Sequence, residues 1–98
     1  MEKVTTDNIF EDLGFSKDEA AQLKRKTMLM LELETILKRG RLNTSQAARR
    51  FGVAKSVLKE LKGNNIDFFS IDVLIQMLDH AGKDVQMIVK NKKRIRAA

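Results

Sequence analysis

The side chains whose types and spacing suit chemistry follow Gly52, in the segment 54–62. Lys55, Ser56 and Lys59 carry hydrogen-bond donors. The four-residue step from Lys55 to Lys59 places both ammonium groups on one face of a helix. Such donors bind phosphates and the polar edges of nucleic-acid bases. The segment therefore predicts binding chemistry rather than bond-making chemistry.

The positive charge of the chain is concentrated around this segment. The 98-residue chain has a formal net charge of +6. Residues 38–65 carry 8 basic and 1 acidic side chains (net +7), whereas residues 1–37 carry 5 basic and 8 acidic ones (net −3). A localised basic patch suits a polyanionic partner. Charge alone fits a solvated lysine-rich face equally well.

Residue types for catalysis and metal binding are sparse. The chain has no cysteine, and its single histidine, His80, precedes Gly82 as an exposed residue of a last helical turn would. No Ser-His-Asp arrangement, P-loop or metal-ligand spacing is present, so we expect no enzyme, no cofactor and no small-molecule ligand. Without a membrane span or signal-peptide pattern, a soluble cytoplasmic protein that does not contact membranes is expected.

The periodicity predicts an all-α bundle of four to five helices in a single domain, residues 1–90, followed by a basic tail, 91–98. Ser16 and Glu19 form a capping box that starts a long helix ending near Arg39, before Gly40. The predicted core face of this helix holds Leu29, Leu33, Ile36 and Leu37. Met28 and Leu31 point the other way, and either the segment 9–15 within residues 1–15 covers them, as we favour, or a partner does. The methionines Met28, Met30, Met77 and Met87 are expected to be core residues.

Capping signals also mark two later helices. Asn43 with Gln46 starts a helix over 43–51, and Ser70 starts another that Gly82 ends. The expected inward residues are Ala47, Ala48 and Phe51 in 43–51, Val57, Leu58 and Leu61 in 54–62, and Ile71, Leu74, Ile75 and Leu78 in the last helix.

Gly52 separates two short helices that would otherwise be continuous. A glycine there permits a positive φ, and Ala47 and Ala48 let the two helices approach closely. Val53 would tuck beneath both helices. This pattern predicts a helix-turn-helix over 43–62 with basic side chains on its polar faces, Arg50 included. An ordinary helical hairpin is the alternative.

The stretch "LNTSQAARRFGVAKSVLKELKGN" resembles the helix-turn-helix of Cro/phage-repressor (XRE-type) regulators. Together with "NIFEDLGF" and "FFSIDVLIQMLDHAGKDVQMIVK", it is similar to HigA-like antitoxins and regulators encoded beside a RelE-like toxin. The resemblance implies a repressor that binds double-stranded DNA and is usually a dimer. Two departures are Thr44, where the family often has glutamine, and Ala54, where it often has a capping serine or threonine.

In a helix-turn-helix the second helix enters the major groove, and its N-terminal residues face the bases. Base readout is therefore predicted for Ala54, Lys55, Ser56 and Lys59, although either lysine fits a phosphate contact as well. Phosphate contacts are predicted for Arg41, Thr44, Ser45, Gln46, Arg49, Lys62, Asn64 and Asn65. Capping is a competing role for residues 44–46.

The segment 84–90 changes to a two-residue period. Val85, Met87 and Val89 alternate with Gln86, Ile88 and Lys90, which predicts one β-strand. A lone strand must be paired, so we expect antiparallel pairing with a second copy in a homodimer on a palindromic operator. Pairing with residues 3–6 of the same chain is the alternative.

These observations predict a sequence-specific repressor, most simply the antitoxin of a type II toxin-antitoxin pair that represses its own operon. The alternative is an interaction module that mainly neutralises a RelE-like toxin. Residues 1–19 carry 6 acidic and 2 basic side chains, which would suit a basic partner, or a solvated surface. RNA binding is a third option, but no aromatic stacking platform supports it.

Overall fold

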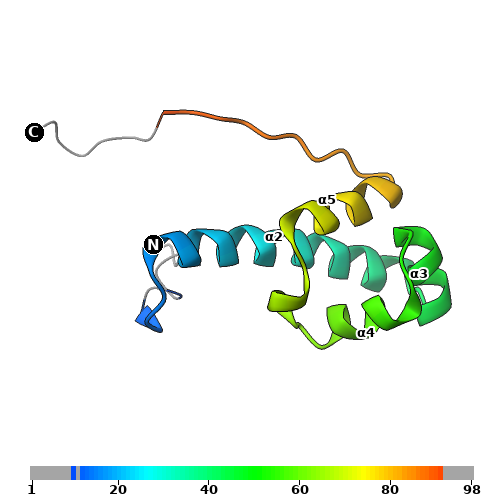
Figure 1. Ribbon diagram of the computed structural model, residues 1–98. Coiled ribbons are helices and arrows are strands. Elements are labelled where there is room, and N and C mark those ends of the chain that lie inside the picture. Colours follow the sequence, from blue (N-terminus) through cyan, green and yellow to red (C-terminus); the bar gives the residue numbers. More distant parts are fainter. Residues whose placement is uncertain (1–9, 11, 92–98) are drawn as a thin grey trace, which may run out of the picture.

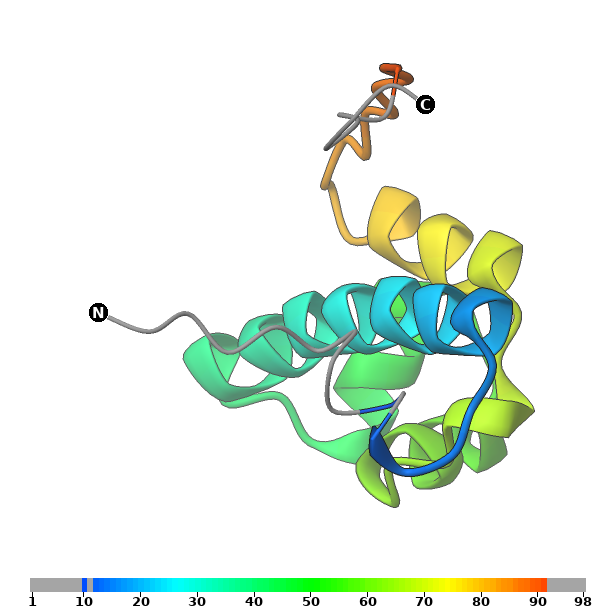
Figure 2. The ribbon, with the colours of Figure 1, turned by 90° about the vertical axis from the view of Figure 1, so that its left-hand side faces the viewer.

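The computed structural model describes residues 10 and 12–91 of the chain (Figure 1). The described elements are the helices α2 (Lys17–Gly40), α3 (Thr44–Phe51), α4 (Lys55–Lys62) and α5 (Ile71–His80), with a 3-10 turn η1 (Ile66–Phe68) before α5. Helix α2 is a long rod; α5 lies along one side of it, and α3 and α4 lie towards its C-terminal half (Figures 1 and 2). The predicted all-α arrangement is confirmed for these residues.

The long helix α2 begins where the sequence predicts. The Ser16 hydroxyl accepts from the Glu19 amide at 3.1 Å, and the Glu19 carboxylate accepts from the Ser16 amide at 2.9 Å. The helix extends through Gly40, and Arg41 takes the left-handed conformation at φ 50°. The helix thus ends one residue later than predicted, and Gly40 leaves room for Leu42: a Cβ there would lie 3.2 Å from the Leu42 side chain.

The core is apolar throughout the described residues. Leu33 and Ile36 are buried as predicted, and Leu29 and Leu37 pack against them half-buried. The remaining core residues are Ala20, Met30, Ala47, Ala48, Phe51, Leu58, Leu61, Phe69, Leu74, Met77, Leu78 and Ala81. These side chains join all four helices into one cluster, apart from Ala20.

The second apolar side of α2 is only partly covered. Phe10 lines a hollow of about 250 Å³ with Thr27, Met30 and Leu31, so the N-terminal segment does fold towards this side. Leu31 nevertheless remains 55% exposed and Met28 56% exposed. The prediction of Met28 as a core residue is wrong, because more than half of its surface stays exposed on the outer side of α2. Ile9 lies outside the described residues.

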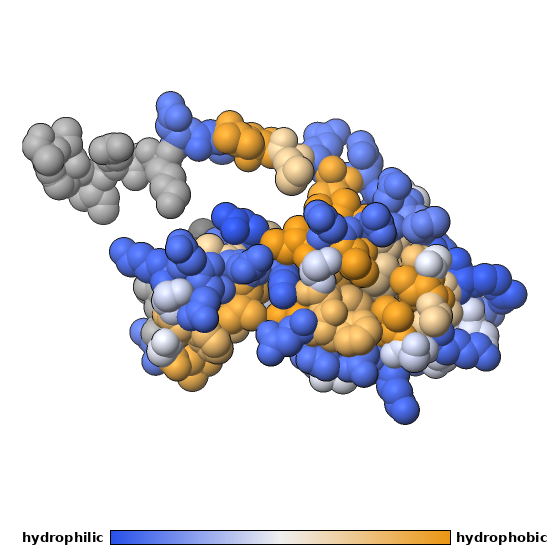
Figure 3. Space-filling model, in the orientation of Figure 1, coloured by the Kyte–Doolittle hydropathy of each residue, from blue (hydrophilic) through white to orange (hydrophobic). Residues whose placement is uncertain are grey.

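The predicted strand at 84–90 is not formed in this chain. After Gly82, with φ 92°, the backbone leaves α5 as an extended segment that stands away from the helices (Figures 1 and 3). Val85 packs against the core, whereas Met87, Ile88 and Val89 are exposed, so Met87 is not the predicted core residue. The physical reason is that a strand exists only as part of a ladder, and residues 10 and 12–91 contain no second strand. Residues 3–6 and 92–98 lie outside the described residues.

Candidate nucleic-acid interface

Helix α3 is closed at both ends by local signals. The Asn43 side chain accepts from the Gln46 amide at 2.8 Å, and the Gln46 side chain accepts from the Asn43 amide at 3.0 Å. At the other end Gly52 adopts φ 70° and ψ 32°, the left-handed conformation predicted for it. The Val53 amide then donates to the Ala48 carbonyl at 2.9 Å, which completes the turn.

Helix α4 packs against α3 and turns a basic face outward. Leu58 and Leu61 are fully buried, and with Phe51 they form the contact beneath the turn. Lys55, Ser56 and Lys59 are all exposed. The segment after Gly52 is therefore a surface helix, as a recognition helix must be.

The N-terminus of α4 has no side-chain cap. Ala54 is the N-cap residue, and its methyl group accepts no hydrogen bond, as its departure from the family pattern implied. The first turn of α4 also lacks an acidic residue. The free amides at this end are therefore available to acceptors outside the protein.

The N-terminus of α3 and the exposed face of α4 meet in one basic hollow. The hollow has a volume of about 410 Å³ and is lined by Thr44, Lys55, Ser56, Lys59 and Lys62. The Lys62 ammonium donates to the Thr44 hydroxyl at 3.0 Å, which links the beginning of α3 to the end of α4. Five of the residues predicted from the sequence thus converge on one surface, which we call the basic groove.

The other predicted phosphate contacts outside the asparagines are exposed but do not line the basic groove. Arg41, Ser45 and Arg49 are exposed. Gln46 is exposed too, but its carbonyl oxygen is engaged in the capping box.

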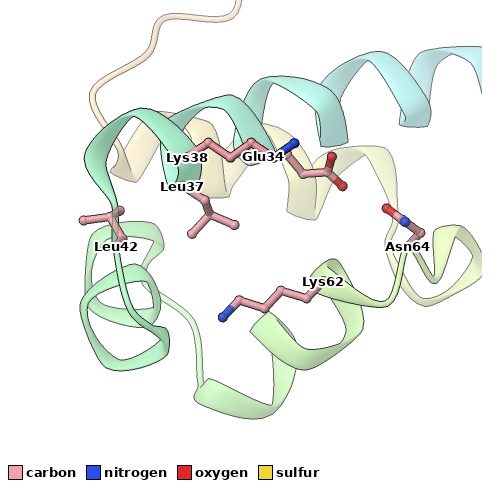
Figure 4. A pocket seen from close by; sticks show the side chains of 6 residues that line it. All are labelled: Glu34, Leu37, Lys38, Leu42, Lys62 and Asn64. Atoms are coloured by element: carbon pink, nitrogen blue, oxygen red, sulfur yellow. The ribbon is translucent and has the colours of Figure 1, made fainter.

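Asn64 and Asn65 follow the end of α4 and lie outside the basic groove. Asn64 adopts φ 57° and lines a second hollow, of about 420 Å³, with Glu34 and Lys38 of α2 (Figure 4). Asn65 donates through its amide to the Glu60 carboxylate at 2.7 Å. Neither asparagine lines the basic groove; Lys62 lines both hollows.

Two side chains, Arg50 of α3 and His80 of α5, join the helix-turn-helix to the end of α5 in ways that the sequence did not indicate. Arg50 donates to the carbonyl of Ala81, through Nη2 at 3.2 Å and Nε at 3.4 Å. The ring of His80 lies over Gly52, so closely that a Cβ at Gly52 would be 2.9 Å from ring carbons. His80 is exposed, as predicted. Local sequence gives no signal for contacts between residues about 30 positions apart.

Comparisons with known proteins agree with this geometry. A family model described as a helix-turn-helix domain matches residues 9–90. The chain is also similar to a solved structure of a protein assigned to the XRE family of transcriptional regulators, with a TM-score of 0.73 and 29% sequence identity. That alignment covers 82% of this chain and 90% of the other. No curated protein matches the chain. In the described residues no helix is long and apolar enough to span a membrane.

Proposed function

The chain belongs to the helix-turn-helix domain family and has the fold of an XRE-type DNA-binding transcriptional regulator, and from this premise we propose that it is a sequence-specific repressor. The observation that carries the proposal is the basic groove, in which predicted contacts from α3 and α4 converge. A recognition helix that is packed on one face and basic on the other is the arrangement that enters a major groove.

Base readout is assigned to the first turns of α4. Lys55 and Lys59 are placed to donate to guanine O6 and N7, and Ser56 to several base edges. Ala54 offers a methyl group that suits the thymine methyl. The exposure of all four residues supports this assignment.

Phosphate contacts are assigned to the rim of the groove. Thr44 and Lys62 already lie within hydrogen-bond distance of each other, and a phosphate oxygen arriving there would accept from the Lys62 ammonium. Arg41, Ser45, Gln46 and Arg49 are exposed and keep their assignment as further phosphate contacts. Asn64 and Asn65 are exposed beyond the end of α4 and stay predictions as phosphate contacts outside the basic groove.

A pair of matched variants tests the proposal on DNA from upstream of the gene that encodes this chain. Lys55→Ala should change the sequence preference, with a loss of about 1–3 kcal/mol that is confined to particular base pairs. Arg41→Ala should instead weaken binding to matched and scrambled duplexes equally. A gel shift or anisotropy titration measures both. Equal losses on every duplex for Lys55→Ala would remove Lys55 from base readout.

A homodimer is proposed from the extended segment 85–89. Met87 and Val89 are 80% and 96% exposed, and the backbone of this segment has no ladder partner in the described chain. Antiparallel pairing with the same segment of a second copy would cover the exposed side chains and give the backbone its hydrogen-bond partners. The dimer would set two α4 helices about 34 Å apart on a palindromic operator. Sedimentation should give a dimer that Met87→Asp dissociates; a monomer of the unmodified chain at micromolar concentration would contradict it.

An antitoxin role is the second candidate function, and one surface favours it. Leu13 and Phe15 are exposed in the segment just before α2, and the exposed acidic residues Asp12, Asp18 and Glu19 are close to them in the sequence. This end of α2 lies away from α3 (Figure 1). An exposed apolar patch with an acidic rim suits a basic protein partner. Co-purification with the product of a neighbouring RelE-like gene would support this role, and Phe15→Ser should weaken that complex without changing DNA binding. A cytoplasmic location follows from either role.

A further inference from the structure

The backbones of the two helices of the basic groove approach the rest of the molecule mainly at α5. The backbone of α4 approaches mainly that of α3, and the backbone of α3 approaches that of α5, which in turn lies along α2. The direction in which α4 is presented therefore depends on how firmly α3 is held against α5. Two side-chain contacts lie at this junction, and neither was assigned to the proposed interface.

The first contact is made by Arg50, in the last turn of α3. Its guanidinium donates two hydrogen bonds to the Ala81 carbonyl, at the C-terminus of α5. The last carbonyls of a helix lack partners within it and lie at the negative end of its dipole. A cation there therefore supplies a hydrogen-bond donor and also interacts favourably with the dipole. Arg50 is thereby directed towards α5 rather than towards the basic groove.

The second contact is made by His80, in the last turn of α5. Its ring lies over the turn that joins α3 to α4, where an ideal Cβ on Gly52 would be 2.9 Å from the ring atoms Cγ and Cδ2. Glycine at position 52 therefore serves two purposes. It allows φ 70°, and it makes room for the histidine ring.

We propose that Arg50 and His80 are positioning residues for DNA binding, which lock the turn between α3 and α4 to the C-terminal end of α5. This inference rests on the proposed function, and it assigns to Arg50 a different role from that of its neighbour Arg49. Arg49 remains a phosphate contact. Arg50 sets the orientation of α4 without touching DNA.

The salt dependence of DNA binding separates the two roles. The slope of log K against log salt is negative. Loss of one phosphate contact makes it less steep by about 0.9, because one fewer counterion is released. Arg49→Ala should show that change. Arg50→Ala should weaken binding by about three- to tenfold and leave the slope unchanged, since a hydrogen-bonded tether within the protein is lost. Arg50→Lys, which keeps one donor towards Ala81, should restore part of the affinity.

The outcomes are distinguishable. The positioning role would be overturned if Arg50→Ala made the salt slope shallower by about 0.9. It would also be overturned if Arg50→Ala bound DNA as tightly as the unmodified chain. If the unmodified chain binds no duplex at all, the proposed function fails instead.

A double-mutant cycle then tests the junction without DNA. The midpoints of urea unfolding are compared for Arg50→Ala, His80→Ala and the double variant. Because both contacts close the same junction, the double variant should lose less stability than the two single losses combined. Additive losses would overturn the proposal.

Discussion

Helices α3 and α4 have equal lengths of eight residues but very different ends. Helix α3 has a complete capping box at its start and a left-handed glycine at its end. Helix α4 starts at Ala54 without a side-chain cap, and Gly63 at its end stays at φ −83°. The first amides of α3 are thus already capped within the protein, whereas those of α4 are left open and, in the proposed complex, would find their acceptors on DNA.

The largest expected effect comes from removing the feature that makes α3 and α4 separate. Gly52→Ala should lower the free energy of unfolding by about 2–3 kcal/mol, because a Cβ at positive φ is strained and would also meet the His80 ring. Urea unfolding measures the loss. In a His80→Ala background the loss should fall to about 1 kcal/mol, since only the backbone strain remains. The same loss in both backgrounds would mean that the ring yields freely.

The next effect tests whether α3 depends on its cap. Asn43→Ala should cost about 1 kcal/mol of unfolding free energy, because the Gln46 amide loses its acceptor. Asn43→Asp keeps the acceptor and should be nearly neutral. If Asn43→Ala is neutral as well, the tertiary contacts of Phe51 and Ala47 hold α3 without help, and the comparison with α4 loses its meaning.

The converse change closes the open end of α4. Ala54→Ser should raise the free energy of unfolding by about 0.5–1 kcal/mol, because a hydroxyl at the N-cap accepts from an amide of the first turn. Titration against operator variants should show a changed preference at the base pair that Ala54 faces. A stability gain with an unchanged operator preference would place Ala54 outside the interface.

Local signals were the part of the fold that sequence could predict. The side chains of Ser16, Asn43 and Ser70 each cap a helix by accepting a hydrogen bond from the backbone amide three residues later. Gly52 has the predicted left-handed conformation. The basic groove followed from these, since the two helices and their turn fix which side chains face outward. The caps and the glycine turn depend on residues close together in the sequence, whereas the groove also needs Thr44 to meet Lys62, 18 positions away.

The features that sequence missed depend on partners far along the chain or outside it. The alternation at Val85–Val89 was a correct sign of extended backbone, but a strand also needs a neighbour. In the sequence Arg50 looks like any other surface cation, yet the carbonyl that accepts its hydrogen bonds belongs to Ala81, 31 residues away. Met28 and Met30 have the same side chain, and only the approach of other elements makes Met30 a core residue.

The smallest effect concerns the link between the two helices. Thr44→Val removes the acceptor of the Lys62 ammonium while keeping the shape of the side chain. On this exposed surface the loss should be about 0.5 kcal/mol of unfolding free energy, with Lys62→Ala in the same background adding nothing further. In the operator complex the loss of binding free energy should exceed this loss of stability, because the Thr44 hydroxyl is one of the proposed phosphate contacts. An unchanged DNA affinity would instead remove Thr44 from the phosphate contacts, and the start of α3 would then serve only to hold the helix in place, unlike the open start of α4.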